Sequence, residues 1–205
     1  MKAFSNADIF AIGRHRFGND GKGVRTLIGF SGCPLRCQYC INPYTWNGTR
    51  KAKSYTPEML FQELSVDNIY FQATGGGVTV GGGEPLLHPQ FISDFIDIAP
   101  RSWDFGVETS LAVPLENIML LVDKIDVFIV DIKSMDENIY RAYTGKNLNL
   151  AKGNLQSLLD LVGGERIIVR VPIIPEYADQ HSQKQSADKL YRLGFSNLDL
   201  FTYRV

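Results

Sequence analysis

Residues 24–40 read VRTLIGFSGCPLRCQYC and join an apolar segment directly to a loop of cysteines. Val24–Phe30 has the apolar character of a buried β-strand. Cys33, Cys37 and Cys40 follow within the next ten residues. Ligands of parallel α/β proteins bind at the carboxyl ends of the strands. This stretch therefore predicts an α/β fold with a chemically active loop after its first parallel strand.

The three cysteines are the only ones in the chain, and their spacing is C-x3-C-x2-C. One short loop can therefore surround a single metal centre, and three thiolates suit a four-iron cluster with one iron left open. Two alternatives stay open. Structural zinc usually has four protein ligands, but no second cysteine pair exists here and His15 lies well upstream. A disulfide would leave one thiol over, and nothing in the sequence resembles a signal peptide.

Apolar strand-like runs alternate with helical runs along the rest of the chain. We expect strands at Val24–Phe30, Val78–Val80, Phe105–Glu108, Val127–Ile132, Ile167–Val171 and Leu198–Tyr203. We expect helices at Thr56–Leu64, Phe91–Ile98, Pro114–Val122, Ala151–Val162 and Gln183–Leu193. The alternation predicts one α/β domain over residues 1–205, with a parallel sheet and right-handed crossovers. Periodicity alone does not separate a barrel from an open doubly wound sheet.

Polar residues stand where these strands end. The cysteine loop follows the first expected strand. At the ends of the second to fifth strands stand, in order, Gly81–Pro85, Glu108–Ser110, Asp131 with Lys133, and Arg170. Because parallel strands share one carboxyl edge, the five segments are expected to meet at one cavity. The glycines allow the backbone to approach a ligand closely. Asp131 and Lys133 are alternate residues that point the same way and should pair with each other or with a ligand.

Four motifs together carry a family resemblance. They are the cysteine loop flanked by 20–26 and 40–46, the run Gly75–Leu87, the triplet Asp131-Ile132-Lys133, and the segment Arg170–Pro175. In this order and spacing they resemble the radical S-adenosylmethionine (radical SAM) superfamily, and within it the activating enzymes of glycyl radical enzymes. The similarity runs from about Ile12 to the C-terminus. It implies the superfamily's six-stranded (β/α)6 partial TIM barrel.

The resemblance also implies the chemistry. Cys33, Cys37 and Cys40 would ligate a [4Fe–4S] cluster whose open iron binds S-adenosylmethionine. An electron from a flavodoxin or ferredoxin would cleave this cofactor to methionine and a 5′-deoxyadenosyl radical. The radical would take a hydrogen atom from a backbone glycine of a partner glycyl radical enzyme. A radical SAM enzyme acting on another peptide or a small molecule is the alternative, and a non-catalytic zinc-binding module is the alternative of a different class.

Carried over residue by residue, the resemblance assigns cofactor contacts. Gly82, Gly83 and Glu84 would hold the amino group of the methionine moiety. Tyr39 would contact the adenine, Asp131 and Lys133 would lie at the ribose and carboxylate, and Arg170 would clamp the carboxylate. Glu108 and Thr109 stand where the family links a monovalent cation to the cofactor. The remaining implied contacts are Cys40, Ile41 and Arg204. His88, after the Gly-Glu-Pro turn, is a weaker candidate.

Several positions depart from the family pattern. Ile41 and Arg204 stand where histidine is common, Gly81 where serine is more usual, and Glu108 where aspartate is usual. The longer Glu108 side chain puts the cation site in doubt. The chain also ends earlier than typical members of the family. The resemblance therefore says least about how this protein would contact its partner enzyme.

Composition and charge agree with an intracellular enzyme. No apolar run is long enough to span a membrane, and the net charge of −1 gives no reason to expect nucleic acid. Reduced thiols fit a cytoplasmic location, and the resemblance implies an anaerobic setting. Residues 1–53 carry nine Lys or Arg against two Asp. This basic segment suits an acidic electron donor, although an ordinary charged surface would look the same.

Overall fold

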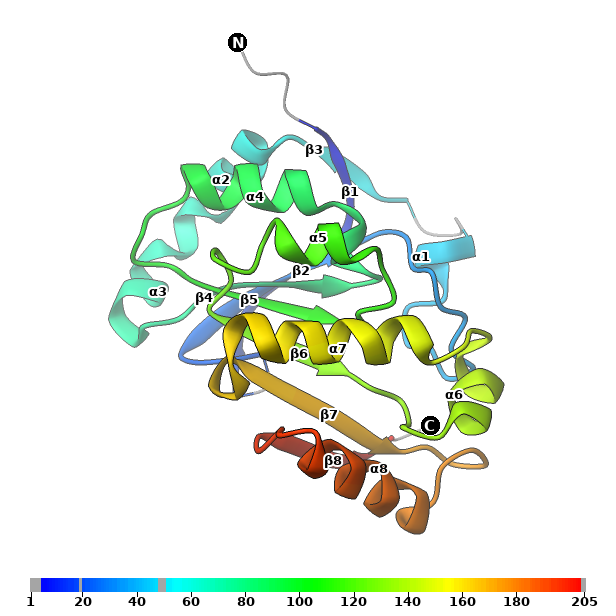
Figure 1. The fold of residues 1–205 in the computed structure, drawn as a ribbon. Coiled ribbons are helices and arrows are strands. Elements are labelled where there is room, and N and C mark those ends of the chain that lie inside the picture. The colour runs from blue at the N-terminus through cyan, green and yellow to red at the C-terminus, as the bar shows by residue number, and fades with distance from the viewer. Residues whose placement is uncertain (1–4, 19, 48–50, 204–205) are drawn as a thin grey trace.

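The computed structural model describes residues 5–18, 20–47 and 51–203 (Figure 1). Its centre is a sheet of eight strands in the order β3-β1-β2-β4-β5-β6-β7-β8. The parallel strands are β2 (Val24–Phe30), β4 (Gly77–Gly82), β5 (Asp104–Thr109), β6 (Val127–Asp131), β7 (Ile167–Ile173) and β8 (Leu198–Thr202). The six expected strands are therefore confirmed, with β4 extended to include Gly81 and Gly82.

The parallel strands lie side by side in the order in which they occur in the sequence. A doubly wound sheet reverses its order at a switch point, whereas this sheet continues in one direction from β2 to β8. With right-handed crossovers, the connecting helices then cover one face of the sheet and the other face turns inward. The fold is thus the α/β partial-barrel type, which periodicity alone had left undecided.

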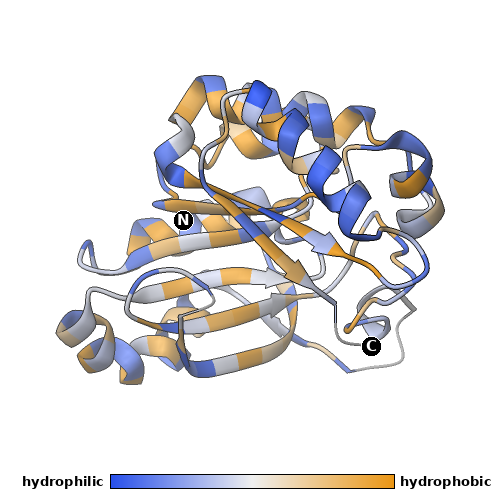
Figure 2. Ribbon diagram, turned by 90° about the horizontal axis from the view of Figure 1, so that it is seen from below, coloured by the Kyte–Doolittle hydropathy of each residue, from blue (hydrophilic) through white to orange (hydrophobic). Residues whose placement is uncertain are grey.

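Most of the helices cover the outer face of the sheet, and those at Tyr44–Asn47 and Glu137–Thr144 lie beside the carboxyl ends of the strands (Figure 1). The described helices are α1 (Tyr44–Asn47), α2 (Pro57–Leu64), α3 (Asn68–Thr74), α4 (Pro89–Ile98), α5 (Leu115–Met119), α6 (Glu137–Thr144), α7 (Asn149–Val162) and α8 (Gln180–Arg192), with short 3-10 turns at Ser65–Asp67, Pro85–Leu87 and Gly164–Arg166. Apolar residues gather in the strands and on the helix faces that meet them (Figure 2). No helix in these described segments is long and apolar enough to cross a membrane.

The main core lies between the sheet and these helices. Val78, Val107, Phe128 and Val169 are fully buried, and they belong to one apolar cluster with helix residues such as Leu155. Strands covered by helices in this way are apolar almost throughout, which explains why the sequence indicates them clearly. Burial of these side chains from water is the main source of the fold's stability.

Two strands that the sequence did not predict extend the sheet beyond β2. β1 (Ala7–Phe17) is antiparallel to β2, and β3 (Lys53–Tyr55) is antiparallel to β1. The register of β1 shifts twice against β2, and much of the strand is only partly buried. Bulges break the two-residue alternation on which strand prediction depends, so the pattern of β1 is obscured.

Helix α6 was also not predicted. It has only eight residues, and its buried face consists of Tyr140, Tyr143 and Thr144. Asp136 caps the helix by accepting hydrogen bonds from the N–H groups of Asn138 and Ile139, at 2.9 and 3.1 Å. Two turns of helix give too few repeats for a periodic signal, although the Asp136 cap is visible in the sequence.

The first glycine run, Gly75–Gly77, shapes the entry to β4. A Cβ atom on Gly76 would lie 2.0 Å from the carbonyl oxygen of Val24, and one on Gly77 would lie 2.0 Å from that of Asp104. These positions therefore admit no side chain, because neighbouring backbone already fills the space.

Candidate active site

A cavity of about 1250 Å³ lies inside the curved sheet. Its wall includes the cysteine loop and Gly83 at the carboxyl ends of the strands, and Asp104 and Val127 at the amino ends of β5 and β6. Strands β1 and β8 contribute Phe10 and Phe201. The segments predicted to converge from distant parts of the sequence do meet at this one space.

The cysteine loop is held from two sides by backbone hydrogen bonds. On one side, Gly83 N donates to Phe30 O at 2.9 Å, and Glu84 N donates to Gly32 O at 2.7 Å. On the other side, the N–H groups of Arg36 and Gln38 donate to carbonyl oxygens in the last turn of α6, at 2.9 and 3.1 Å. The loop is thus fixed between the glycine-rich turn and a helix end.

The thiols of Cys33, Cys37 and Cys40 are free, partly buried, and part of the same cavity wall. Burial raises the pKa of Cys33 to about 12 and also raises that of Cys37. Such thiols become thiolates when a cation compensates their charge, as a bound metal does. Among the described residues, no group of three or more His, Cys, Asp or Glu is placed to hold one metal ion. Three thiols on one loop can offer one thiolate to each of three irons of a four-iron cluster.

The glycine-rich turn after β4 accepts only glycine at two positions. Gly82 has φ +94°, and a Cβ atom there would lie 2.7 Å from Gly29 Cα. A Cβ atom on Gly83 would lie 2.1 Å from Gly32 O. Both glycines line the cavity, so this turn offers backbone polar groups to a ligand while packing against the cysteine loop.

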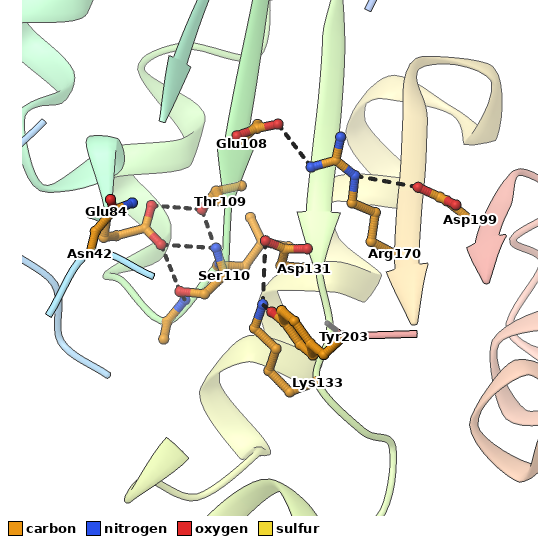
Figure 3. A network of polar contacts seen from close by, with 12 residues as sticks. Asn42, Glu84, Glu108, Thr109, Ser110, Asp131, Lys133, Arg170, Asp199 and Tyr203 are labelled. Atoms are coloured by element: carbon orange, nitrogen blue, oxygen red, sulfur yellow. Dashed lines mark hydrogen bonds and ion pairs between the residues drawn. The ribbon is translucent and has the colours of Figure 1, made fainter. Parts of the chain in front are cut away.

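Glu84 does not line the cavity with its neighbours. Its side chain is fully buried, and the carboxylate accepts hydrogen bonds from Thr109 Oγ1 at 2.7 Å, Ser110 Oγ at 2.6 Å, Ser110 N at 2.9 Å and Leu86 N at 3.3 Å (Figure 3). Burial raises the pKa of Glu84, and these donors oppose that effect. The carboxylate therefore joins the turn after β4 to the end of β5, which is a structural role that the sequence did not indicate.

We expect Glu84→Gln to lower the free energy of unfolding by about 1–3 kcal/mol, because an amide group would face hydrogen-bond donors with its own N–H groups. Urea unfolding of the cluster-loaded protein measures this loss. Glu165→Gln is the matched control, because Glu165 is exposed and this variant should unfold as the wild type does. Equal stability of the two variants would contradict the role assigned to Glu84.

Two charged groups line the inner face of the sheet (Figure 3). Lys133 Nζ lies 3.3 Å from Asp131 Oδ2 and donates to Tyr203 Oη at 2.9 Å. Burial opposes the charge on Lys133, but Asp131 and Tyr203 outweigh it and raise the pKa of its ammonium group. Lys133 therefore stays cationic inside the cavity wall. Its contact with Asp131 is the pairing that the alternation of the two residues predicted.

The second group centres on Arg170. Its Nη1 donates to Glu108 Oε1 at 2.8 Å, and its Nε lies 3.5 Å from Asp199 Oδ2. Burial raises the pKa of Glu108, and Arg170 counteracts this. Because Glu108 is bound to a guanidinium group, one of its oxygens is already used by the protein. Both the length of the Glu108 side chain and its pairing with Arg170 therefore count against a cation site here.

Most of the predicted contact residues lie on the cavity wall: Tyr39, Cys40, Ile41, Gly82, Gly83, Glu108, Thr109, Asp131, Lys133 and Arg170. Arg204 falls outside the described residues. His88 does not line the cavity, and its Nε2 lies 3.4 Å from Ser31 O while its ring packs on Phe30. The Tyr39 hydroxyl donates to Glu176 Oε2 at 3.0 Å.

Sequence reasoning missed several residues of the wall, notably Tyr143, Tyr203 and Asp199. Tyr143 belongs to the unpredicted helix α6, and its ring lies against those of Tyr39 and Tyr203. Asp199 follows the first residue of β8, and a strand's inner face cannot be assigned before its partner is known.

A partial barrel with three free cysteines on the loop after its first parallel strand defines a class of enzyme, and comparisons with known proteins agree. Residues 27–182 match the model of the radical SAM superfamily. A pyruvate formate-lyase-activating enzyme of Clostridium pasteurianum is 34% identical over 163 residues, which cover 78% of this chain and 66% of that protein. A (2S)-3-sulfopropanediol dehydratase activating enzyme of Klebsiella oxytoca is 30% identical, covering 83% of this chain and 72% of that protein.

A solved structure supports the fold. The crystal structure of Streptococcus suis SuiB bound to S-adenosylmethionine superposes with a TM-score of 0.65 at 11% identity, over 84% of this chain and 39% of that chain. The chain belongs to the radical SAM superfamily and, within it, to the activating enzymes of glycyl radical enzymes. The superfamily uses a [4Fe–4S] cluster and S-adenosylmethionine. Because the chain belongs to this superfamily, the hypothesis of a radical SAM enzyme is favoured over that of a non-catalytic zinc-binding module.

Proposed function

We propose that this protein cleaves S-adenosylmethionine reductively and uses the resulting radical to take a hydrogen atom from a backbone glycine of a partner enzyme. The observation that carries this proposal is the meeting of three free thiols, a glycine-only turn and paired charges at one cavity. When bound, the cluster and the cofactor supply the electron and the 5′-deoxyadenosyl radical.

The residues of the chain bind and orient these groups. Cys33, Cys37 and Cys40 would hold the [4Fe–4S] cluster on a loop that is fixed from both sides. Gly82 and Gly83 present backbone groups to the amino end of the cofactor, and Glu84 fixes that turn from behind. Asp131 and Lys133 stand on β6 and just after it, where a ribose and a carboxylate would be recognised.

Arg170 is proposed as the carboxylate clamp, with its orientation set by the protein. Glu108 of β5 and Asp199 of β8 both contact the guanidinium, so the side chain is held before a ligand arrives. The side chain also lines the cavity, where its guanidinium group could meet the carboxylate of a ligand. Tyr39, Ile41 and Thr109 complete the proposed cofactor contacts.

The shape of the sheet supports a macromolecular substrate. The cavity wall includes residues of both β1 and β8, which lie near opposite edges of the eight-stranded sheet. A barrel that does not close leaves its lumen open between such edges, and an extended peptide can enter there. The two relatives compared above are both named as activating enzymes of other enzymes. We therefore propose a glycine loop of a glycyl radical enzyme as the substrate.

An acidic flavodoxin or ferredoxin is the proposed electron donor, and the basic balance of residues 1–53 supports this choice. Electrostatic association of this kind weakens as salt screens the charges. A cytoplasmic location without membrane or nucleic acid partners stays a prediction.

The test is an anaerobic assay of the purified protein. After reconstitution with iron and sulfide and reduction by dithionite, we expect a brown protein that forms 5′-deoxyadenosine from S-adenosylmethionine. Addition of a glycyl radical enzyme from the same genome should produce the electron paramagnetic resonance (EPR) signal of a glycyl radical. Product without this signal would point to another peptide or a small molecule as substrate. A folded protein that binds zinc and forms no product would overturn the proposal.

A further inference from the structure

The cysteine loop has an outer face that the proposed chemistry does not use. Cys33, Leu35 and Cys37 line the cavity, whereas Arg36, which lies among them in sequence, does not line it and is exposed to solvent. Arg36 is also the one charged residue in the segment 31–49. The loop therefore presents its thiols to the cavity and a single positive charge to the outside.

The charge of Arg36 is held in a fixed place. Its Nη1 donates to Cys33 O at 2.6 Å and to Leu35 O at 2.7 Å. Its Cζ lies 4.9 Å from the centre of the Trp46 ring, whose face attracts a cation. The residue nevertheless remains exposed. A surface cation that is already ordered loses little conformational freedom when a partner binds it, so Arg36 is suited to recognition.

Two short helices flank this outer face (Figure 1). On one side, Gly32 N donates to Thr45 O of α1 at 2.9 Å, and on the other, Arg36 N donates to Thr144 O of α6 at 2.9 Å. Lys146 follows α6 directly, is exposed, and is held by a hydrogen bond from its N–H group to Thr144 Oγ1 at 3.2 Å. A second cation therefore stands next to the residue whose carbonyl group holds Arg36.

The charge around the loop is positive. Residues 21–57 contain six Lys or Arg and no Asp or Glu. Within α6 the acid Glu137 is paired with Arg141 at 3.1 Å, so this helix adds no net negative charge. The carboxylate of Glu176 does contact the loop, but at the hydroxyl of Tyr39, which belongs to the cavity wall. The outer face is therefore complementary to an acidic protein surface.

The position of this face favours an electron donor over other acidic partners. The proposed cofactor and substrate would occupy the cavity, so a protein that delivers electrons has to approach the cluster from outside. Arg36 is joined to the backbone of the cluster ligand Cys33 by a single hydrogen bond. A partner that contacts Arg36 would thus come close to the cluster without entering the cavity. Electron transfer slows steeply with distance, so this is a favourable place for a donor.

We infer that Arg36 and Lys146, on the outer face of the cysteine loop, form the docking site for an acidic one-electron donor protein. The inference rests on the proposed function and adds to it the surface at which reduction takes place. One electron passes from the donor, which is oxidised, to the cluster, which is reduced, and no atom is exchanged. Arg36 positions the donor and does not contact the cofactor or the substrate.

The test compares the cluster-loaded wild type with Arg36→Gln, using an acidic flavodoxin that has been fully reduced and freed of chemical reductant. Calorimetric titration gives the Kd of the complex, and 5′-deoxyadenosine measures turnover at limiting flavodoxin. At low salt we expect the Kd to rise by about fivefold, the effect of losing one contact between unit charges in water, with an equal loss of turnover. The difference should shrink at high salt, because ions screen the charges.

Dithionite separates docking from a structural role of Arg36. Because this small reductant needs no docking site, Arg36→Gln should form product with dithionite as the wild type does. Arg36→Lys keeps the charge and should restore most of the affinity for flavodoxin. The matched control is Arg192→Gln, because Arg192 is exposed at the end of α8, ahead of the amino end of β8 and far from the loop (Figure 1). This variant should keep the wild-type Kd.

Lys146→Gln keeps the inference testable if Arg36→Gln does not bind the cluster, and it should also weaken flavodoxin binding. An unchanged Kd in both variants would overturn the inference and leave the proposed function intact. So would an equal loss of product with flavodoxin and with dithionite, which would make Arg36 a structural residue of the loop. If the variants formed 5′-deoxyadenosine normally but failed to activate a glycyl radical enzyme, the face would bind that enzyme and the inference would be wrong. A wild type without product under dithionite would overturn both.

Discussion

Replacement of Cys37 by alanine is expected to remove the cluster and the activity together. Each of the three thiols would hold one iron, and loss of one leaves two irons without a protein ligand. Mutation of the residues that hydrogen-bond to metal ligands typically lowers metal affinity or activity by about 10–100-fold. Loss of a ligand itself should therefore lower 5′-deoxyadenosine formation by more than about 100-fold. The iron and sulfide contents and the product, assayed after anaerobic reconstitution, measure this effect.

The same loop offers a control for Cys37→Ala. Gln38 is exposed and is held through its backbone N–H group, which donates to Tyr143 O at 3.1 Å. Gln38→Ala keeps that bond and should keep the cluster and the activity. The Cys37 variant should still fold, because Cys37 packs only at the border of the small cluster around Tyr143, Ile174 and Ala178. A Cys37→Ala protein with full iron content and product formation would exclude this loop as the metal site.

Replacement of Gly83 by alanine is expected to separate the cofactor turn from the cysteine loop. The new Cβ atom would lie 2.1 Å from Gly32 O and 2.8 Å from Phe30 O, and backbone atoms cannot move aside as a flexible side chain can. Overpacking of this kind costs about 3 kcal/mol. It should also break the hydrogen bonds from Gly83 N and Glu84 N to the cysteine strand and loop. Urea unfolding and titration with S-adenosylmethionine measure the two effects, which we expect to be a lower midpoint and weaker binding.

Gly153→Ala is the matched control for this variant. Gly153 lies in α7, and a Cβ atom there would have nothing within 4 Å. Alanine is favoured over glycine in a helix by about 0.8–1.0 kcal/mol, so this variant should be slightly more stable than the wild type and bind the cofactor equally well. If Gly83→Ala behaved in the same way, the close contact between the two loops would not be needed for the site.

The sequence predicted the strands best where they are apolar almost throughout. Val127–Asp131 and Ile167–Ile173 are of this kind, and they were predicted to within two residues. β1 was missed because its bulges and partial exposure hide the alternation, and α6 because two turns carry too little periodicity. The missed helix matters for the site, since it supplies Tyr143 to the cavity wall and the carbonyl oxygens that hold the cysteine loop.

The sequence by itself determined the chemistry of this protein. The cysteine spacing, the glycine run and the alternate Asp131 and Lys133 are local patterns, and each restricts what its own segment can bind. Which side chains face the ligand and which support the site was decided by the tertiary structure. Glu84 turns into the protein because Thr109 and Ser110 of the next strand supply its hydrogen bonds, and Arg170 is held by Glu108 and Asp199 from the strands around it. Such partners lie 25 to 62 positions apart in sequence, so only folding brings them within hydrogen-bond distance.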